Sequence, residues 1–245
     1  MNIGYAIRDF FFPPICPGCR EVFRAKYGEK NQLCPSCERK WELLEANICA
    51  ECGERYSDCR CAPGALGSAG ATRLIKLVPY LKNRAVSNNV VLFIKKKRDN
   101  RVFGFIADKL WRELNRAVTK LGVRREDILL TWCPRTRRAV NEYGFDQARV
   151  LAEKLSKKSG IECRELVKRS PFYSRAQKKL DAKKRAKNIK GAFYLKKGAE
   201  IKGKTVILVD DLVTTGCTMG ECARVLKKGG AALILGACVA YTEKA

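Results

Sequence analysis

The chain has 245 residues, 46% of them hydrophobic and 31% charged, a composition that excludes a disordered protein and provides for one large core with a small additional module. Lysine and arginine number 50 against 25 acidic residues, a formal net charge of +25; this favours polyanionic partners and phosphate ligands, with a contribution to solubility alone as the alternative. Histidine is absent, so any metal site must use other ligands, and Ser-His or Cys-His catalysis is excluded.

The N-terminus contains an aromatic cluster, Phe10-Phe11-Phe12, which follows Arg8-Asp9 and ends at Pro13-Pro14. This apolar stretch is too short and too interrupted for a signal peptide, and no apolar run in the chain approaches the roughly 20 residues that cross a bilayer. We therefore expect a short N-terminal helix that packs on the main body, no membrane insertion, and a cytoplasmic protein.

Eight of the 13 cysteines lie in the first 61 residues, as three C-x2-C pairs and one C-x-C pair. Such pairs place two sulfurs close enough to share a tetrahedral zinc ion, whereas disulfides are disfavoured in a reducing cytosol. So short a segment would barely fold without metal, and the cysteines can fill both coordination spheres, so the predicted role of zinc is structural. The simplest assignment is sequential, with a cross-braced one still open; the sequential sets are Cys16, Cys19, Cys34 and Cys37, then Cys49, Cys52, Cys59 and Cys61.

Residues 62–72 carry no charge and are rich in glycine and alanine, as expected of a linker. We expect an N-terminal helix and double zinc module at 1–61, a linker at 62–73 and a second domain at 74–245. In the second domain the patterns indicate strands separated by helices, which predicts an α/β fold with a parallel sheet covered by helices on both faces. The expected strands are 74–80, 128–133, 205–209 and 232–241, and the expected helices are 88–97, 103–114, 147–158 and 219–228.

Two segments of the second domain are strongly basic: Lys95-Lys96-Lys97-Arg98 at a predicted helix end, and residues 168–190, in which Asp181 is the single acid. Phe172 and Tyr173 lie within the longer segment. Basic residues interleaved with aromatics can track single-stranded nucleic acid by phosphate contact and base stacking. Single-stranded DNA is therefore a candidate partner, and a solvated charged helix is the alternative.

The strand expected at 205–209 is followed by two acids and a hydroxyl-rich turn at a helix start: Asp210-Asp211, then Thr214, Thr215, Gly216, Cys217 and Thr218. Ligands of open parallel sheets bind at the carboxyl ends of the strands, and the N–H groups and dipole of a helix start favour an anion. Gly216 permits close approach of a phosphate, and the two carboxylates suit a sugar diol and Mg²⁺. The sequence thus predicts a ribose 5-phosphate site; a solvated strand end beside an ordinary helix cap is the alternative.

The stretch VILVDDLVTTGCT resembles the phosphoribosyl pyrophosphate motif of type I phosphoribosyltransferases. Residues 132–138 and 142–148 are similar to the proline-ending strand, basic loop and RGFNQA segment of the ComF (ComFC-like) family. The Q-x2-L-x4-R-x2-N-x2-GAF stretch of that family is matched by Gln177, Leu180, Arg185, Asn188 and residues 191–193. In the family a double zinc ribbon precedes a phosphoribosyltransferase-type domain, so the resemblance implies a type I phosphoribosyltransferase-like sheet here.

The resemblance also implies ligands and residue roles. The ligands are phosphoribosyl pyrophosphate, or a related sugar phosphate, and Mg²⁺. The resemblance implies that Asp210 and Asp211 bind the ribose hydroxyls and that residues 214–218 bind the 5-phosphate. The pyrophosphate faces the loop of Arg135, Thr136, Arg137 and Arg138, and the implied catalytic residues are Asp210, Asp211 and Arg138; a solvated turn is the alternative for Arg137-Arg138.

The sequence departs from the family pattern at several positions. Tyr143 stands where arginine is usual, Asp146 where asparagine is usual, and Cys217 where alanine is common. Trp132-Cys133 replaces the more usual Pro-Val. A lost positive charge and a gained negative charge on the pyrophosphate side would weaken anion binding, which bears on turnover more than on the fold.

Two compatible functions follow. One is an active phosphoribosyltransferase with an unidentified acceptor base, which catalyses by positioning and by stabilising the departing pyrophosphate and needs no histidine. The other is a protein of DNA uptake (natural transformation), as the ComF resemblance implies, whose ribose-phosphate site binds DNA or senses the metabolite.

Overall fold

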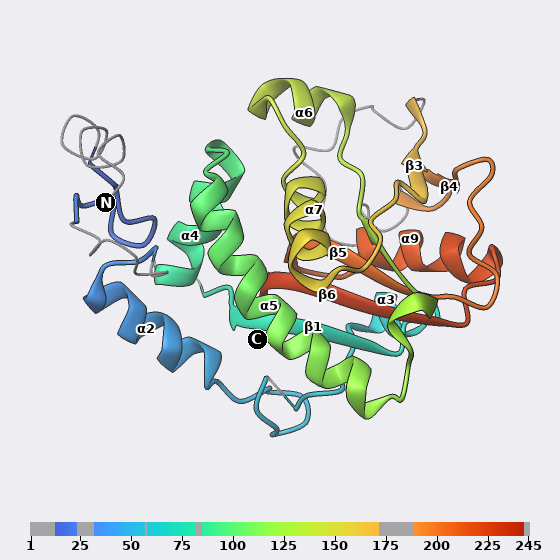
Figure 1. Ribbon diagram of the computed structural model, residues 1–245, viewed down its shortest axis with the longest axis horizontal. Helices are drawn as coiled ribbons and strands as arrows, with labels where there is room; N and C mark the ends of the chain where they lie inside the picture. Colours follow the sequence, from blue (N-terminus) through green and yellow to red (C-terminus); the bar gives the residue numbers. More distant parts are fainter. Residues whose placement is uncertain (1–12, 24–31, 57, 82–84, 172–188, 243–245) are drawn as a thin grey trace.

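The structure, a computed structural model, describes residues 13–23, 32–56, 58–81, 85–171 and 189–242. A four-stranded parallel sheet runs through this part of the chain in the order β1-β6-β5-β2 (Figure 1). The strands are β1 (Arg73–Pro79), β2 (Ile128–Trp132), β5 (Thr205–Val213) and β6 (Leu233–Tyr241). Nearly every residue of these strands is buried, as expected of strands covered on both faces. The predicted parallel sheet is confirmed, whereas the expected N-terminal helix falls largely on residues 1–12, outside the described residues.

Helices cover both faces of the sheet, which confirms the predicted α/β layering. Ile207 and Val209 of β5 join the core on one face, and Val206 and Leu208 join the core on the other, because successive side chains of a strand alternate. The first face is covered by α4 (Val86–Lys96), α5 (Asn100–Lys120) and α7 (Gln147–Ser159), and the second by α9 (Cys217–Lys228). None of the helices in the described ranges is long and apolar enough to cross a membrane.

β5 is longer than the sequence predicted. It runs to Val213 instead of ending at residue 209, so Asp210 and Asp211 lie inside the strand. The physical reason is pairing: β6 continues to Tyr241 and supplies partners for Leu212 and Val213. The two neighbouring carboxylates therefore leave opposite faces of the sheet, Asp210 on the face of α9 and Asp211 on the face of α4, α5 and α7. α9 likewise begins two residues before the predicted start at 219.

Smaller elements lie at the two ends of β2. α6 (Arg137–Tyr143) follows that strand, and η1 (Arg125–Asp127) precedes it. A separate antiparallel pair, β3 (Val167–Arg169) and β4 (Phe193–Leu195), was not predicted. This pair brackets residues 172–188, so most of the predicted basic segment lies outside the described residues.

The cysteine-rich module packs directly on the α/β domain. Its helix α2 (Pro35–Glu45) carries Trp41, which is fully buried in the same core as α5. The Trp41 indole donates to Glu45, and Glu45 forms a 2.9 Å ion pair with the buried Lys109 of α5. Asn89 of α4 also donates to the Gly18 carbonyl at 2.6 Å. The module is therefore attached by buried polar contacts as well as by apolar packing.

Residues 62–73, the predicted linker, lie against the α/β domain. They contain a short helix, α3 (Gly64–Gly67), whose Leu66 is fully buried against α9. A Cβ placed on Gly220 of α9 would lie 2.3 Å from the Ala65 carbonyl oxygen, and one on Gly216 would lie 3.0 Å from Pro63 Cβ. The segment thus packs beneath the turn at the start of α9 and is held against the α/β domain.

Candidate functional site

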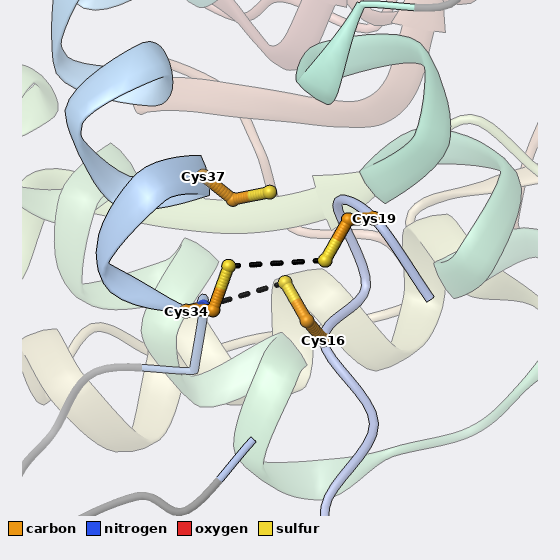
Figure 2. A group of neighbouring side chains, drawn as sticks. All are labelled: Cys16, Cys19, Cys34 and Cys37. Atoms are coloured by element: carbon orange, nitrogen blue, oxygen red, sulfur yellow. Dashed lines mark hydrogen bonds between the residues drawn. The ribbon is translucent and has the colours of Figure 1, made fainter. Parts of the chain in front are cut away.

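The eight N-terminal cysteines gather into two groups of four, in the sequential sets expected from the spacing. In each group the Sγ atoms lie within 4.8 Å of one another. Figure 2 shows the first group, in which Cys19 Sγ and Cys34 Sγ are 3.8 Å apart, close to the sulfur–sulfur spacing of about 3.8 Å around a zinc ion with 2.3 Å bonds. The sulfurs therefore fit tetrahedral zinc without an open coordination position.

Local geometry explains why the chain can form these groups. Cys34 precedes α2 and Cys37 lies in its first turn, so the helix start brings both sulfurs to one side. The Cys34 amide donates to Cys16 Sγ at 3.3 Å, a contact typical of thiolate ligands. Gly18 is needed because a Cβ there would lie 2.8 Å from Cys37 Sγ. The second group, at Cys49, Cys52, Cys59 and Cys61, lies beside β1.

The predicted phosphate turn connects β5 with α9. Gly216 has φ +73°, a left-handed conformation that glycine adopts without strain, and it begins α9 without a side-chain cap. Thr214 and Thr215 are exposed, and Thr218 is half-buried. A small hollow of about 50 Å³ is lined by Asp210 and residues 212–219. The positive end of α9, threonine hydroxyls and the Asp210 carboxylate thus share one concave surface.

The two aspartates have different surroundings. Asp211 is buried, and its Oδ2 accepts a 2.6 Å hydrogen bond from Arg135 Nη2 and lies 3.9 Å from Lys95 Nζ. Its Oδ1 accepts from the Leu212 amide. Asp210 accepts from the Asp211 amide, and burial, then the neighbouring Asp211 charge, raises the pKa of Asp210 well above its usual range. Asp211 therefore holds Arg135 in place, while Asp210 is the carboxylate that a cation or hydroxyl donor would stabilise.

Lys95 is a site residue that sequence reasoning missed. The sequence placed it in a basic cluster at a helix end, with no signal that it lies near the acids. Gln147, at the start of α7, donates to the Lys95 carbonyl at 2.8 Å and fixes the end of α4 against the sheet. This contact between distant segments brings the Lys95 ammonium to Asp211.

Asp146 has a local structural role. Its Oδ1 accepts from the amides of Ala148 and Arg149, which caps α7, and its Oδ2 accepts from the Arg135 amide at 3.2 Å. An asparagine side chain has a single oxygen for such bonds, so the aspartate suits this position. Its charge is therefore engaged by three backbone donors.

A groove of about 1040 Å³ opens beside these residues and includes the loop predicted to face pyrophosphate. Within the described residues, four arginines of this groove form no ion pair: Arg98, Arg137, Arg138 and Arg169. Arg138 makes no ion pair with either aspartate there, and the Thr136 hydroxyl caps α6 by accepting from the Ala139 amide. The structure thus brings the basic loop and Asp211 together through Arg135, and it places Arg137 and Arg138 on the groove wall.

Arg169 of β3 was not singled out as a site residue. Its guanidinium packs over the Phe193 ring at 5.1 Å, and its Nε and Nη2 are buried without a hydrogen-bond partner in the part of the chain that the structure describes. Burial lowers the pKa of Arg169. A buried guanidinium without a partner is costly, so this position suits an anionic ligand.

Comparisons with known proteins match both parts of the chain. The family model described as double zinc ribbon domain matches residues 7–66, and the one described as phosphoribosyl transferase domain matches residues 144–245. DNA utilization protein YhgH of Escherichia coli O6:H1 is 26% identical over 215 residues, covering 86% of this chain and 90% of that protein. Competence protein ComFC of Bacillus subtilis is 26% identical over 225 residues, covering 88% and 85%. Competence protein F of Haemophilus influenzae is 38% identical over 88 residues, covering 36% and 38%.

Proposed function

Because this chain belongs to the ComF family, with a double zinc ribbon before a phosphoribosyl transferase domain, we propose that it binds phosphoribosyl pyrophosphate or ribose 5-phosphate together with Mg²⁺. The observation that carries the proposal is the β5–α9 connection, where an uncapped helix start, threonines and Asp210 line one hollow. A groove lined by arginines that form no ion pair within the described residues is linked to this strand through Arg135, which pairs with Asp211. A sugar phosphate that also carries a pyrophosphate group fits this arrangement, with the 5-phosphate at the hollow and the pyrophosphate at the arginine groove.

Each part of the ligand has its own counterpart in the site. The 5-phosphate accepts hydrogen bonds from the turn at 214–218, and the ribose hydroxyls donate to Asp210. The pyrophosphate lies toward Arg135, Arg137 and Arg138, whose guanidinium forks suit phosphate oxygens.

Asp210 supplies an oxygen ligand of the kind that Mg²⁺ prefers, and a divalent cation would stabilise its ionised form, which burial and then the neighbouring Asp211 charge disfavour by raising the pKa of Asp210. When bound, Mg²⁺ would neutralise part of the pyrophosphate charge. Asp211 keeps Arg135 oriented through its 2.6 Å ion pair. Transfer of the ribosyl group to an acceptor base would then depend on positioning and on charge stabilisation of the leaving group; these residues do not identify the base.

We place the protein in the cytoplasm, where reducing conditions keep the zinc ligands as thiolates.

Calorimetric titration with phosphoribosyl pyrophosphate and with ribose 5-phosphate tests the site. Asp210→Asn should weaken binding of both ligands by about tenfold or more, the effect expected when a charged hydrogen-bond partner is lost. Asp127→Asn is the matched control, because Asp127 pairs with Lys204 next to the amino end of β2. Unchanged affinity for both ligands in Asp210→Asn would refute the assignment. Pyrophosphate release with candidate bases then tells an active enzyme from a binding protein.

A second function, binding of single-stranded DNA, is favoured by a separate observation. Arg98, Arg137, Arg138 and Arg169 line one groove without acidic partners in the described residues, and Trp132 and Tyr194 line it as well. Guanidinium groups and aromatic rings are the components that hold a nucleic-acid strand. The relatives named for competence and DNA utilization support a role in DNA uptake.

Anisotropy with a labelled oligonucleotide tests this second function. Binding should weaken with rising salt, survive Asp210→Asn, and fall in the double variant Arg137→Gln, Arg138→Gln. Binding that ignores the arginine substitutions would assign DNA to another surface.

A further inference from the structure

Lys76 is a buried lysine that contacts a cysteine sulfur. It lies in the middle of β1 and is 2% exposed. Its Nζ is 3.2 Å from Cys49 Sγ, and it lies 4.5 and 4.6 Å from the ring centroids of Tyr56 and Tyr241. A buried ammonium costs several kcal/mol unless a negative group compensates for it. No carboxylate within the described ranges forms an ion pair with Lys76, so its compensation comes from elsewhere.

The second cysteine group supplies the missing negative charge. Four thiolates around one zinc ion leave a net charge of about −2, and Cys49 belongs to that set. The aromatic faces add a weaker attraction for the cation. Parallel pairing of Lys76 with Cys238 fixes the lysine along β1, so the ammonium is held at the sulfur by the sheet itself.

The first cysteine group has no such cation. In the described ranges, its sulfurs contact the Cys34 amide, Glu21 and one another, and no lysine or arginine nitrogen. The two groups are otherwise matched in exposure, since each has two buried, one half-buried and one exposed cysteine. Within the described residues, the hydrogen bond from Lys76 therefore distinguishes the second group from the first.

We propose that Lys76 is an outer-sphere positioning residue of the second zinc centre, which donates a hydrogen bond to Cys49 Sγ, offsets one of the two excess negative charges, and makes these thiolates less nucleophilic than those of the first centre. Hydrogen-bond donors that contact a metal ligand, and not the metal itself, orient that ligand and tune its basicity. The first centre is then the one that electrophiles attack first. The zinc ribbon would thus contain one reactive and one protected site.

Alkylation by N-ethylmaleimide is a direct test of thiolate reactivity. The thiolate electron pair forms a new S–C bond to the alkene carbon, the resulting enolate takes a proton from water, and the neutral thioether no longer holds zinc strongly. A hydrogen bond from Lys76 competes for that electron pair. Zinc release can be followed with a chromogenic chelator, and mass spectrometry of peptides assigns each modified cysteine to its group.

In the zinc-loaded full chain, we expect cysteines of the first group to be modified first. Lys76→Met should raise the modification rate of the second group by about tenfold, the effect of a lost charged hydrogen bond, and leave the first group unchanged. Lys76→Arg should preserve most of the protection. Lys109→Met is the matched control, because Lys109 is also buried at this interface but pairs with Glu45 instead of a sulfur.

Two results would overturn the proposal. One is a wild-type chain whose second group reacts as fast as the first, a measurement that needs no variant. The other is a folded Lys76→Met chain that binds two zinc ions and keeps the wild-type order of modification. If Lys76→Met is purified with less metal, zinc loss confined to the second group supports the proposal, and equal loss from both groups contradicts it.

Discussion

A substitution at Gly220 tests how residues 62–73 support the turn between β5 and α9. Gly220 lies in the first turns of α9, where an added Cβ would meet the Ala65 carbonyl oxygen at 2.3 Å and the carbonyl carbon at 2.9 Å. Ordinary contact begins near 3.4 Å, so α3 or α9 must move by about 1 Å. Overpacking of this kind costs about 1–3 kcal/mol, while replacing glycine by alanine inside a helix gains about 0.5–1 kcal/mol.

Gly104 provides the matched control. It lies inside α5, and a Cβ there would have nothing within 4 Å, so Gly104→Ala should show the helix gain alone. Gly220→Ala should therefore be less stable than Gly104→Ala by about 1–3 kcal/mol. For a chain of this size, about 2–4 °C of melting temperature corresponds to each kcal/mol.

Scanning calorimetry at equal zinc content measures this difference, and titration with ribose 5-phosphate measures its consequence for binding. We expect Gly220→Ala to melt at least about 2 °C below Gly104→Ala and to bind ribose 5-phosphate more weakly, because the displaced helix start forms the turn. Equal melting temperatures would refute the reasoning, since α3 would then not be packed beneath α9.

Three further predictions concern the metal, the groove and pH. Removing zinc with a strong chelator under reducing conditions should lower the melting temperature and change Trp41 fluorescence in one transition, because that side chain is buried against α5; separate transitions would contradict this. Arg135→Ala should weaken binding of phosphoribosyl pyrophosphate by about tenfold and that of ribose 5-phosphate much less, as titration can show. Arg224, and to a smaller extent the Gly191 amide, hold the pKa of Glu221 below its usual range. The stabilisation by ionised Glu221 is present at neutral pH and lost as pH falls through its lowered pKa, so the melting temperatures of wild type and Glu221→Gln should converge below about pH 4.

Periodic and apolar patterns predicted the architecture well. Ile207 and Val209 belong to a continuous apolar run, a pattern that predicts a strand buried on both faces. The short spacing within each cysteine pair predicts that its two sulfurs bind the same metal ion. These signals are local, so they were sufficient for the four parallel strands and the helices that cover them, whereas the strand order and the choice between sequential and cross-braced cysteine sets needed the structure.

Features that depend on distant partners were not predictable. β5 continues past residue 209 because β6 supplies pairs for Leu212 and Val213, and an aspartate pair by itself reads as a strand end. Lys95 reaches Asp211 through a contact between α4 and α7. Each three-residue strand of β3 and β4 is too short to show a periodicity of its own.

The packing of residues 62–73 beneath the β5–α9 turn determines which fragments of the chain would keep that turn supported. Cys61, a member of the second cysteine group, is two residues from Pro63, which packs beneath Gly216. A fragment that begins at residue 74 keeps nearly all of the sheet but loses the surface on which the phosphate turn rests. The boundary suggested by composition is therefore a poor place to cut, and the smallest fragment with a supported turn has to include Pro63 and α3.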